Sequence, residues 1–167
     1  MAFSLQSNWQ LQSELTAPLD LSTPTSLLKL ARQLNFAEGA GAGQANMIWH
    51  DKVTINASST QTVDLAGTLT GPFGTTLTFA RVKMLLVLAS PGNTNNVNVV
   101  RDSTNGVPLF LAAGDGVPVK PGGMLWWYDP TAAGVSVTAG SGDLLNLVNS
   151  GAGTSVSADV VVVGASS

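Results

Sequence analysis

The chain has 167 residues, of which 44% are hydrophobic and only 10% are charged, and its net charge is −3 at pH 7. This length predicts one globular unit with a sizeable core, while the charged fraction lies far below the roughly 25% of an ordinary soluble domain. With so few acidic and basic side chains, few residues are available to act as catalytic acids or bases. We therefore expect a protein that is not an enzyme.

The same composition argues against several partners. Seven Lys and Arg residues against ten Asp and Glu give no basic surface for a phosphate backbone, so nucleic-acid binding is not expected. Without cysteine, and with His50 as the single histidine, the chain offers no thiolate or multi-histidine metal site, and no cofactor is expected. No apolar stretch reaches the roughly 18 residues of a membrane span, and the N-terminus lacks the features of a signal peptide. We expect no membrane partner and a product that is made in the cytoplasm without a signal peptide.

Residues 1–26 are apolar but contain two prolines and no basic residue. Their large apolar side chains are Phe3, Leu5, Trp9, Leu11, Leu15, Leu19 and Leu21. We find no clear helical or strand period in this segment and expect an extended arm that lies along another surface, with a disordered terminus as the alternative. Phe3, Trp9, Leu11 and Leu15 are then candidate partner-binding residues.

Residues 27–36 are compatible with two structures. Leu27, Leu30, Ala31 and Leu34 share a helical face after Pro24, whereas Leu28, Leu30, Leu34 and Phe36 share one side of a strand, with Arg32 as the exception. We favour the strand because the rest of the chain is typical of β structure. The expected organisation is an arm over residues 1–26 and a β-sandwich domain over residues 27–167.

From residue 44 onward, short runs rich in Val, Thr, Leu and aromatic residues alternate with Gly, Pro, Asn and Asp clusters. This spacing predicts about nine strands in a sandwich or barrel. They are centred on Met47–Asp51, Thr62–Leu65, Thr76–Ala89, Asn96–Arg101, Leu109–Ala112, Met124–Tyr128, Val135–Thr138, Leu144–Asn149 and Ser155–Val163. Two of these runs, Val82–Ala89 and Val160–Val163, are apolar on both faces, which predicts cover by the arm or by another subunit and hence a homo-oligomer, a dimer or trimer.

The candidate chemical groups have structural explanations. His50 and Asp51 are adjacent on a predicted strand, so their side chains point to opposite faces, and no nucleophile is marked beside them. Four aspartates, Asp102, Asp115, Asp129 and Asp143, lie in or beside predicted turns, where aspartate bonds its own backbone. Residues 39–43, Gly-Ala-Gly-Ala-Gly, lack the lysine of a phosphate-binding loop and are interpreted as a flexible connector.

The most pointed constellation is Trp126-Trp127-Tyr128. On a strand one tryptophan faces the core while its neighbour faces outward, so one large aromatic side chain is either exposed or covered by a partner. These three residues are therefore candidates for a subunit contact, with stacking on a sugar ring as the less favoured alternative.

A family resemblance extends over about residues 36–164. The landmarks are Phe36, Gly39–Gly43, Gln44-Ala45-Asn46, Ile48-Trp49, Asp64-Leu65-Ala66-Gly67, Phe73-Gly74, Leu77-Thr78-Phe79-Ala80, Lys83, Val119-Lys120-Pro121-Gly122-Gly123, Val137-Thr138-Ala139-Gly140, Asp143-Leu144, Asn149-Ser150-Gly151 and Val160–Gly164. In their order they resemble a class of tailed-bacteriophage virion proteins. The resemblance carries no catalytic residues.

The resemblance implies an all-β, jelly-roll-like antiparallel β-sandwich with an extended N-terminal arm. The expected function is structural: a virion protein that decorates or cements the capsid, with the major capsid protein or other virion proteins as partners and the virion as its location. A phage tail, fibre or adaptor component is the first alternative, and a carbohydrate-binding β-sandwich is the second.

Overall fold

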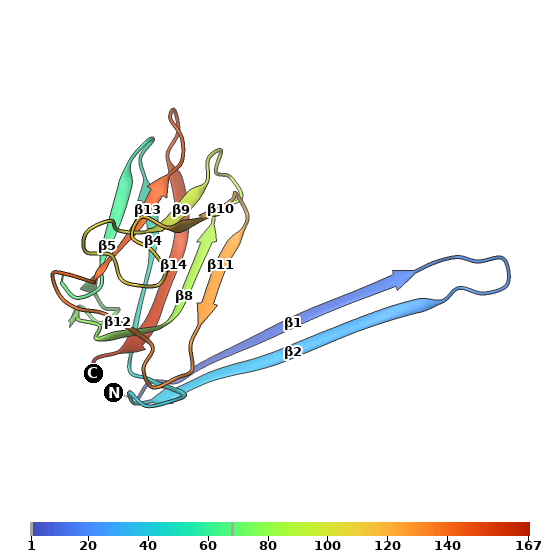
Figure 1. Ribbon diagram of the computed structural model, residues 1–167, viewed down its shortest axis with the longest axis horizontal. Coiled ribbons are helices and arrows are strands. Elements are labelled where there is room, and N and C mark those ends of the chain that lie inside the picture. Colours follow the sequence, from blue (N-terminus) through green and yellow to red (C-terminus); the bar gives the residue numbers. More distant parts are fainter. Residues whose placement is uncertain (1, 68) are drawn as a thin grey trace.

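A computed structural model describes residues 2–67 and 69–167, and over these residues the chain is built from strands and turns without a helix (Figure 1). The strands are β1 (Leu5–Thr16), β2 (Thr25–Glu38), β3 (Gln44–Ala45), β4 (Met47–Ile55), β5 (Thr60–Asp64), β6 (Leu69–Thr70), β7 (Thr76–Leu77), β8 (Arg81–Ala89), β9 (Val97–Arg101), β10 (Gly116–Val119), β11 (Met124–Tyr128), β12 (Val135–Ser136), β13 (Leu144–Asn149) and β14 (Val156–Ala165). The expected all-β fold is confirmed.

Two antiparallel sheets form the body of the molecule. One has the order β11-β8-β14-β4, with β12 also paired to β8, and the other has the order β10-β9-β13-β5. The strands of both alternate, so that apolar side chains from the two sheets pack into one core. Its fully buried members include Val82, Leu85, Val87, Val97, Val99, Leu145, Leu147, Val160 and Val162. The body is therefore a β-sandwich, as expected.

β1 and β2 form a long hairpin that projects away from the sandwich (Figure 1). Their antiparallel register runs from the pair Leu5 and Phe36 at the root to the pair Thr16 and Thr25 near the tip. At about 3.4 Å per residue, twelve residue pairs make a ribbon about 40 Å long. Residues 17–24 connect the two strands, which places both prolines of the segment in the turn.

The hairpin changes the expected organisation of the N-terminal half. The strand favoured for residues 27–36 is confirmed, but it pairs with residues 5–16 instead of joining the sandwich. Residues 1–26 are thus one half of a hairpin with a regular strand period, and the expected boundary after residue 26 lies inside β2. The strands of the sandwich begin after the Gly39–Gly43 connector.

Within the body the predicted strand Thr76–Ala89 is divided into β7, which pairs with β6, and β8. Another predicted strand is wrong. Residues 109–112 are a loop, and the strand that pairs with β9 lies later, at β10. The Arg101 guanidinium donates hydrogen bonds to the carbonyl oxygens of Gly106, Phe110 and Leu111, which gives these backbone groups partners outside a sheet. Leu109 and Phe110 pack against the core from this loop, which explains their apolar character without a strand.

A bulge near the end of β14 depends on glycine. The register of β14 on β8 shifts between Val163 and Gly164. A Cβ atom at Gly164 would collide with the carbonyl oxygen of Arg81 and press on the ring of Phe79. Only glycine fits this close approach of two backbones.

Candidate functional site

The two faces of the projecting hairpin differ sharply in polarity. We call one of them the hairpin face; its side chains are Leu5, Ser7, Trp9, Leu11, Ser13 and Leu15 from β1 and Ser26, Leu28, Leu30, Arg32, Leu34 and Phe36 from β2. The opposite face carries Gln6, Asn8, Gln10, Gln12, Glu14 and Thr16 with Thr25, Leu27, Lys29, Ala31, Gln33 and Asn35. Because side chains alternate along each strand, this register gathers most of the apolar residues of the hairpin on one side.

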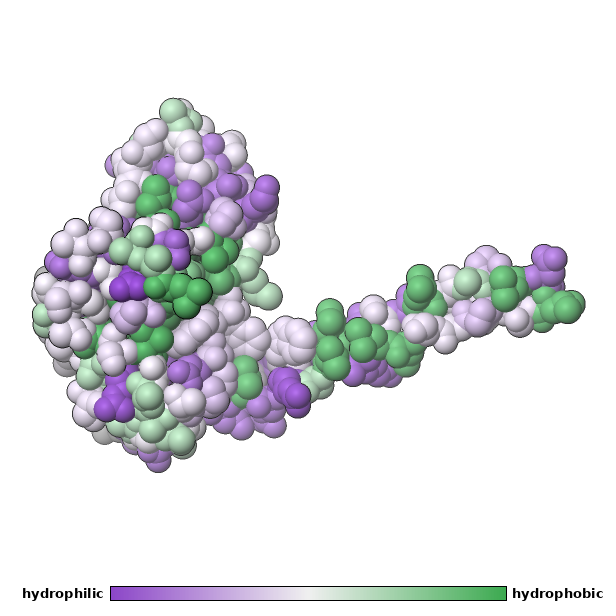
Figure 2. Space-filling view, in the orientation of Figure 1, coloured by the Kyte–Doolittle hydropathy of each residue, from purple (hydrophilic) through white to green (hydrophobic). Residues whose placement is uncertain are grey.

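The outer part of the hairpin face has no cover from the residues that the structure describes, 2–67 and 69–167. Leu15 is 73% exposed, and Leu11, Leu28 and Leu30 are each exposed by close to half. Figure 2 shows apolar side chains along the projecting ribbon. A contiguous apolar surface of this kind is typical of a site that another molecule covers.

The root of the hairpin is buried against the body. Phe36 is 2% exposed, and its ring lies 5.1 Å from that of Tyr128 on β11. Met84 of β8 and Val163 of β14 are buried in the same cluster, which we call the root cluster. Part of the second apolar face predicted for β8 and β14 is therefore covered by the hairpin root of the same chain, which was one of the two kinds of cover expected.

A buried lysine holds the connector between the hairpin and the sandwich. Lys83 of β8 is fully buried, and its Nζ donates hydrogen bonds to the carbonyl oxygens of Ala40, Gly41 and Gln44 at 2.9, 2.6 and 2.9 Å. Burial lowers the pKa of this ammonium group, with a further contribution from Arg81 and an opposing one from Asp129. The connector, interpreted from the sequence as flexible, is instead tied to β8 by charge-assisted hydrogen bonds to two of its own carbonyl oxygens and to that of Gln44, which directly follows it.

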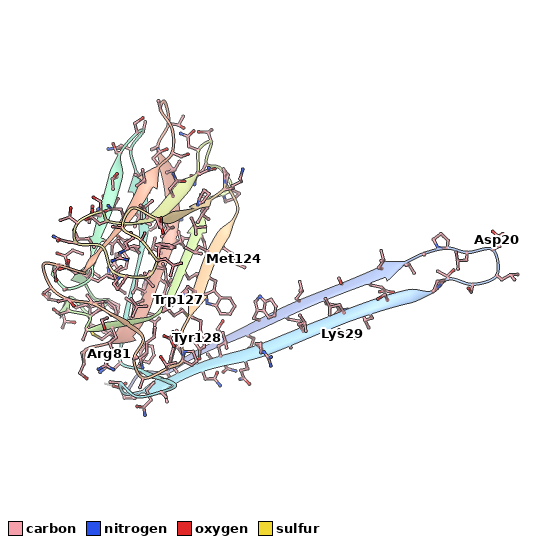
Figure 3. All side chains as sticks on the ribbon, viewed as in Figure 1. Asp20, Lys29, Arg81, Met124, Trp127 and Tyr128 are labelled. Atoms are coloured by element: carbon pink, nitrogen blue, oxygen red, sulfur yellow. The ribbon has the colours of Figure 1, made fainter. Side chains whose placement is uncertain are left out.

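Beside the root, the outer side of the five-stranded sheet carries a second apolar patch. We call it the sheet patch; it consists of Leu86, Leu88, Met124 and Trp126. Met124 is 61% exposed, and Trp9 of the hairpin face lines the same hollow. Figure 3 shows Met124 on the side of the body that faces the hairpin. The hairpin face and the sheet patch are thus continuous at this hollow.

The aromatic triplet is divided between the two sides of β11. Trp127 packs against the main core, whereas Trp126 and Tyr128 lie on the outer side in the root cluster. The predicted alternation is therefore confirmed. Burial raises the pKa of Tyr128, with a smaller contribution from Asp129. Of the three residues, Trp126 is the one that lines the hollow beside Trp9.

The other partner-binding residues predicted from the sequence lie either on the hairpin face or in the root cluster. Trp9, Leu11 and Leu15 all belong to the hairpin face, whereas Phe3 packs in the root cluster and its backbone N–H donates to a Glu38 carboxylate oxygen. Sequence reasoning missed Leu28, Leu30 and Leu34 as members of the same surface. The signal was present, because the apolar residues of residues 3–15 all occupy odd positions.

The four turn aspartates bond their own backbone, as predicted. Asp102 accepts from the N–H groups of Thr104 and Asn105, and the other three carboxylates accept from residues two or three positions away. The hydrogen bonds from Asn105, Thr104 and the Asn146 side chain hold the pKa of Asp102 below its ordinary value of 3.8. These carboxylates stabilise turns.

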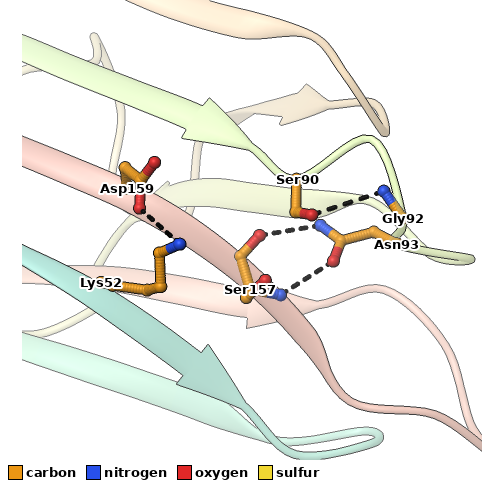
Figure 4. A network of polar contacts seen from close by, with 6 residues as sticks. All are labelled: Lys52, Ser90, Gly92, Asn93, Ser157 and Asp159. Atoms are coloured by element: carbon orange, nitrogen blue, oxygen red, sulfur yellow. Dashed lines mark hydrogen bonds and ion pairs between the residues drawn. The ribbon is translucent and has the colours of Figure 1, made fainter.

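The far end of the five-stranded sheet is polar. Lys52 and Asp159 form an exposed ion pair of 3.6 Å across β4 and β14 (Figure 4). Nearby, the Asn93 side chain donates to the carbonyl oxygen of Ser157 and accepts from its N–H, each at 2.9 Å. His50 and Asp51, on the same edge strand, are both exposed. This end of the sheet lacks the apolar character of the sheet patch.

No cluster of three or more His, Cys, Asp or Glu residues suited to a metal ion occurs in residues 2–67 and 69–167. Over the same residues there is no helix long and apolar enough to cross a membrane. Comparison of the chain with protein-family models, with curated proteins and with solved structures gives no match.

Proposed function

We propose that this protein is a structural subunit of a bacteriophage virion that decorates or cements the capsid through subunit contacts. The observation that carries the proposal is the hairpin face, an apolar surface on a ribbon that projects about 40 Å from a folded body. Apolar area of this extent is stable in water only when another molecule covers it. In an assembly, a neighbouring subunit would cover this surface.

The arrangement of the sandwich supports the same proposal. In chain order, its eight main strands are β4, β5, β8, β9, β10, β11, β13 and β14. The first, third, sixth and eighth form one sheet and the second, fourth, fifth and seventh form the other, in the orders 1-8-3-6 and 2-7-4-5 from edge to edge. From this strand order we infer a jelly roll, a fold that occurs in viral capsid proteins and lectins. The resemblance seen in the sequence points to the same class.

A cement protein acts by mass action. If it binds only the assembled lattice, each occupied site stabilises that lattice by about 4 kcal/mol at a thousandfold excess over Kd. Repetition over many sites makes the whole shell resist heat and pressure. No catalytic group is needed for such a role.

The decisive test is the number of copies in a purified virion of the phage that encodes this chain. A head decoration protein is expected at hundreds of copies per particle. A few to a few tens of copies would instead support the alternative of a tail, fibre or adaptor component. Absence from the particle would overturn both.

A shortened hairpin tests whether the hairpin carries the contact. Residues 11–30 are replaced by Asn-Gly, which joins Gln10 to its register partner Ala31 through a two-residue turn and keeps the buried root. We expect a folded sandwich that no longer occupies particles lacking the protein. Trp9→Ala is expected to weaken occupancy about tenfold, which corresponds to about 1.4 kcal/mol. Full occupancy by the shortened chain would refute a role of the hairpin in attachment.

A second candidate function is glycan binding, and the observation that favours it is that Trp9 and Trp126 line one hollow. Aromatic faces stack on sugar rings, and the jelly-roll fold also occurs in lectins. A glycan array probed with the wild-type chain and with Trp126→Ala tests this function. Binding that the substitution abolishes would establish it, and a blank array would remove it.

A further inference from the structure

We propose that the hairpin face of one copy is covered by the hairpin face of a second copy, so that the protein is a two-fold dimer joined through its hairpins. This inference rests on the proposed role as an assembly subunit and names the partner of the exposed surface. It excludes cover of the outer hairpin by the body of its own chain.

The connection to the body prevents such self-cover. Lys83 ties the connector to β8 through three carbonyl oxygens, and the N–H of Gly43 donates to the carbonyl oxygen of Pro130 at 2.8 Å. Phe36 is buried against Tyr128 at the same place. With its root fixed in this way, the ribbon leaves the sandwich as Figure 1 shows, with its tip near Asp20 remote from the body (Figure 3). The residues beyond Trp9 must find their cover in another chain.

The hairpin face is suited to packing against itself. Arg32 is the only charged residue among the twelve side chains of this face, so two such faces can pack together with few contacts between like charges. Glu14 and Lys29 lie on the opposite face, where they stay in water when the two apolar sides meet. A two-fold contact uses the same patch on both subunits, which this surface provides.

The antiparallel two-fold arrangement also covers the sheet patch. When two hairpins pack antiparallel, the tip of each lies at the root of the other, beside Leu88 and Met124. The tip carries Leu19 and Leu21, which are 62% and 100% exposed. One contact would therefore cover the three most exposed apolar regions around the hairpin: its face, its tip and the sheet patch.

The area agrees with a specific dimer. A face about 40 Å long and about 10 Å wide, together with the sheet patch, offers on the order of 600 Å² per copy. A symmetric pair would remove roughly 1,200 Å² from water, the lower end of the range for specific protein contacts.

Two neighbouring leucines supply a matched test. Leu28 lies on the hairpin face and is 45% exposed, whereas Leu27 lies on the opposite face and is 52% exposed. Sedimentation equilibrium of the full chain at 1–100 µM, a range of about two decades, is measured for the wild type, Leu28→Gln and Leu27→Gln. We expect a wild-type dimer whose dissociation constant rises at least tenfold in Leu28→Gln and less than twofold in Leu27→Gln. Leu11→Gln, on the other strand of the same face, is expected to behave like Leu28→Gln, and circular dichroism confirms that each variant is folded.

The outcomes separate this inference from the proposed function. A wild-type chain that stays monomeric, forms a trimer, or forms a dimer equally sensitive to both leucine substitutions would overturn the inference. If such a chain is still present at hundreds of copies in the virion, the proposed function stands. A dimer that Leu28→Gln dissociates, in a protein absent from virions, would support the inference and overturn the proposed function.

Discussion

Replacing Lys83 by methionine tests whether the buried ammonium group fixes the hairpin to the sandwich. The substitution keeps a side chain of similar length but removes three hydrogen bonds, to the carbonyl oxygens of Ala40 and Gly41 in the connector and of Gln44 just after it. Each hydrogen bond from a charged donor contributes about 1.5–3 kcal/mol, while removal of the ammonium group also removes its desolvation cost. We expect a net loss of about 2–4 kcal/mol in the free energy of unfolding.

Thermal unfolding followed by circular dichroism measures this loss. For a chain of this size, about 2–4 °C is lost per kcal/mol, so Tm is expected to fall by about 5–15 °C. The matched control is Lys52→Met, which removes an exposed ion pair and is expected to change stability by no more than about 0.5 kcal/mol. Equal melting temperatures for Lys83→Met and the wild type, with unchanged amide exchange in residues 39–44, would refute the role assigned to Lys83.

Three further predictions concern the sandwich. Because the pKa of Asp102 is lowered in the folded state, its carboxylate stabilises the fold at pH values above the ordinary pKa of 3.8, and this stabilisation is lost as the pH falls through the lower folded pKa. The urea midpoint of the wild type should therefore fall more steeply with decreasing pH than that of Asp102→Asn. Parallel curves for the two proteins would contradict this. Trp127→Ala should lower the free energy of unfolding by about 3 kcal/mol and Trp126→Ala by less than half of that, since only Trp127 packs into the main core; equal losses in urea titrations would disprove the assignment. Gly164→Ala should prevent folding or cost more than about 3 kcal/mol because its Cβ would meet backbone, whereas Gly92→Ala, with only a serine side chain near, should leave the melting temperature nearly unchanged.

The sandwich could be predicted because its signals are local. Two of the predicted strands, Met124–Tyr128 and Leu144–Asn149, have the bounds that the structure gives them. The turn aspartates were predictable for the same reason, since each bonds backbone within three residues of itself. Strand periodicity also predicted that Trp126 and Trp127 point to opposite sides.

The hairpin was only partly predictable. The alternation in residues 27–36 indicated a strand, but its partner lies earlier in the chain, across a turn that contains both prolines. The sequence of either strand alone does not predict that the apolar sides of β1 and β2 lie on the same face of the hairpin. That depends on the register in which the two strands pair. The ligands of Lys83 are similarly remote, because its three carbonyl partners lie about forty residues before it. A lysine in an alternating strand is ordinarily interpreted as solvent-facing.

The geometry of the hairpin ties its stability to assembly. A two-stranded ribbon alone in water is marginally stable at best, and beyond the root β1 and β2 pair only with each other among the described residues. Most of the apolar side chains of the outer ribbon lie on one side, and the fixed root holds the residues beyond Trp9 away from their own sandwich (Figure 1). In the proposed dimer, the free energy that orders the outer hairpin comes from the second copy, so binding and ordering of this segment are expected to occur together. A binding site for a small ligand does not require that ordering of a long hairpin be coupled to binding of another chain. Such coupling suits a subunit whose hairpin needs to be ordered only within an assembly.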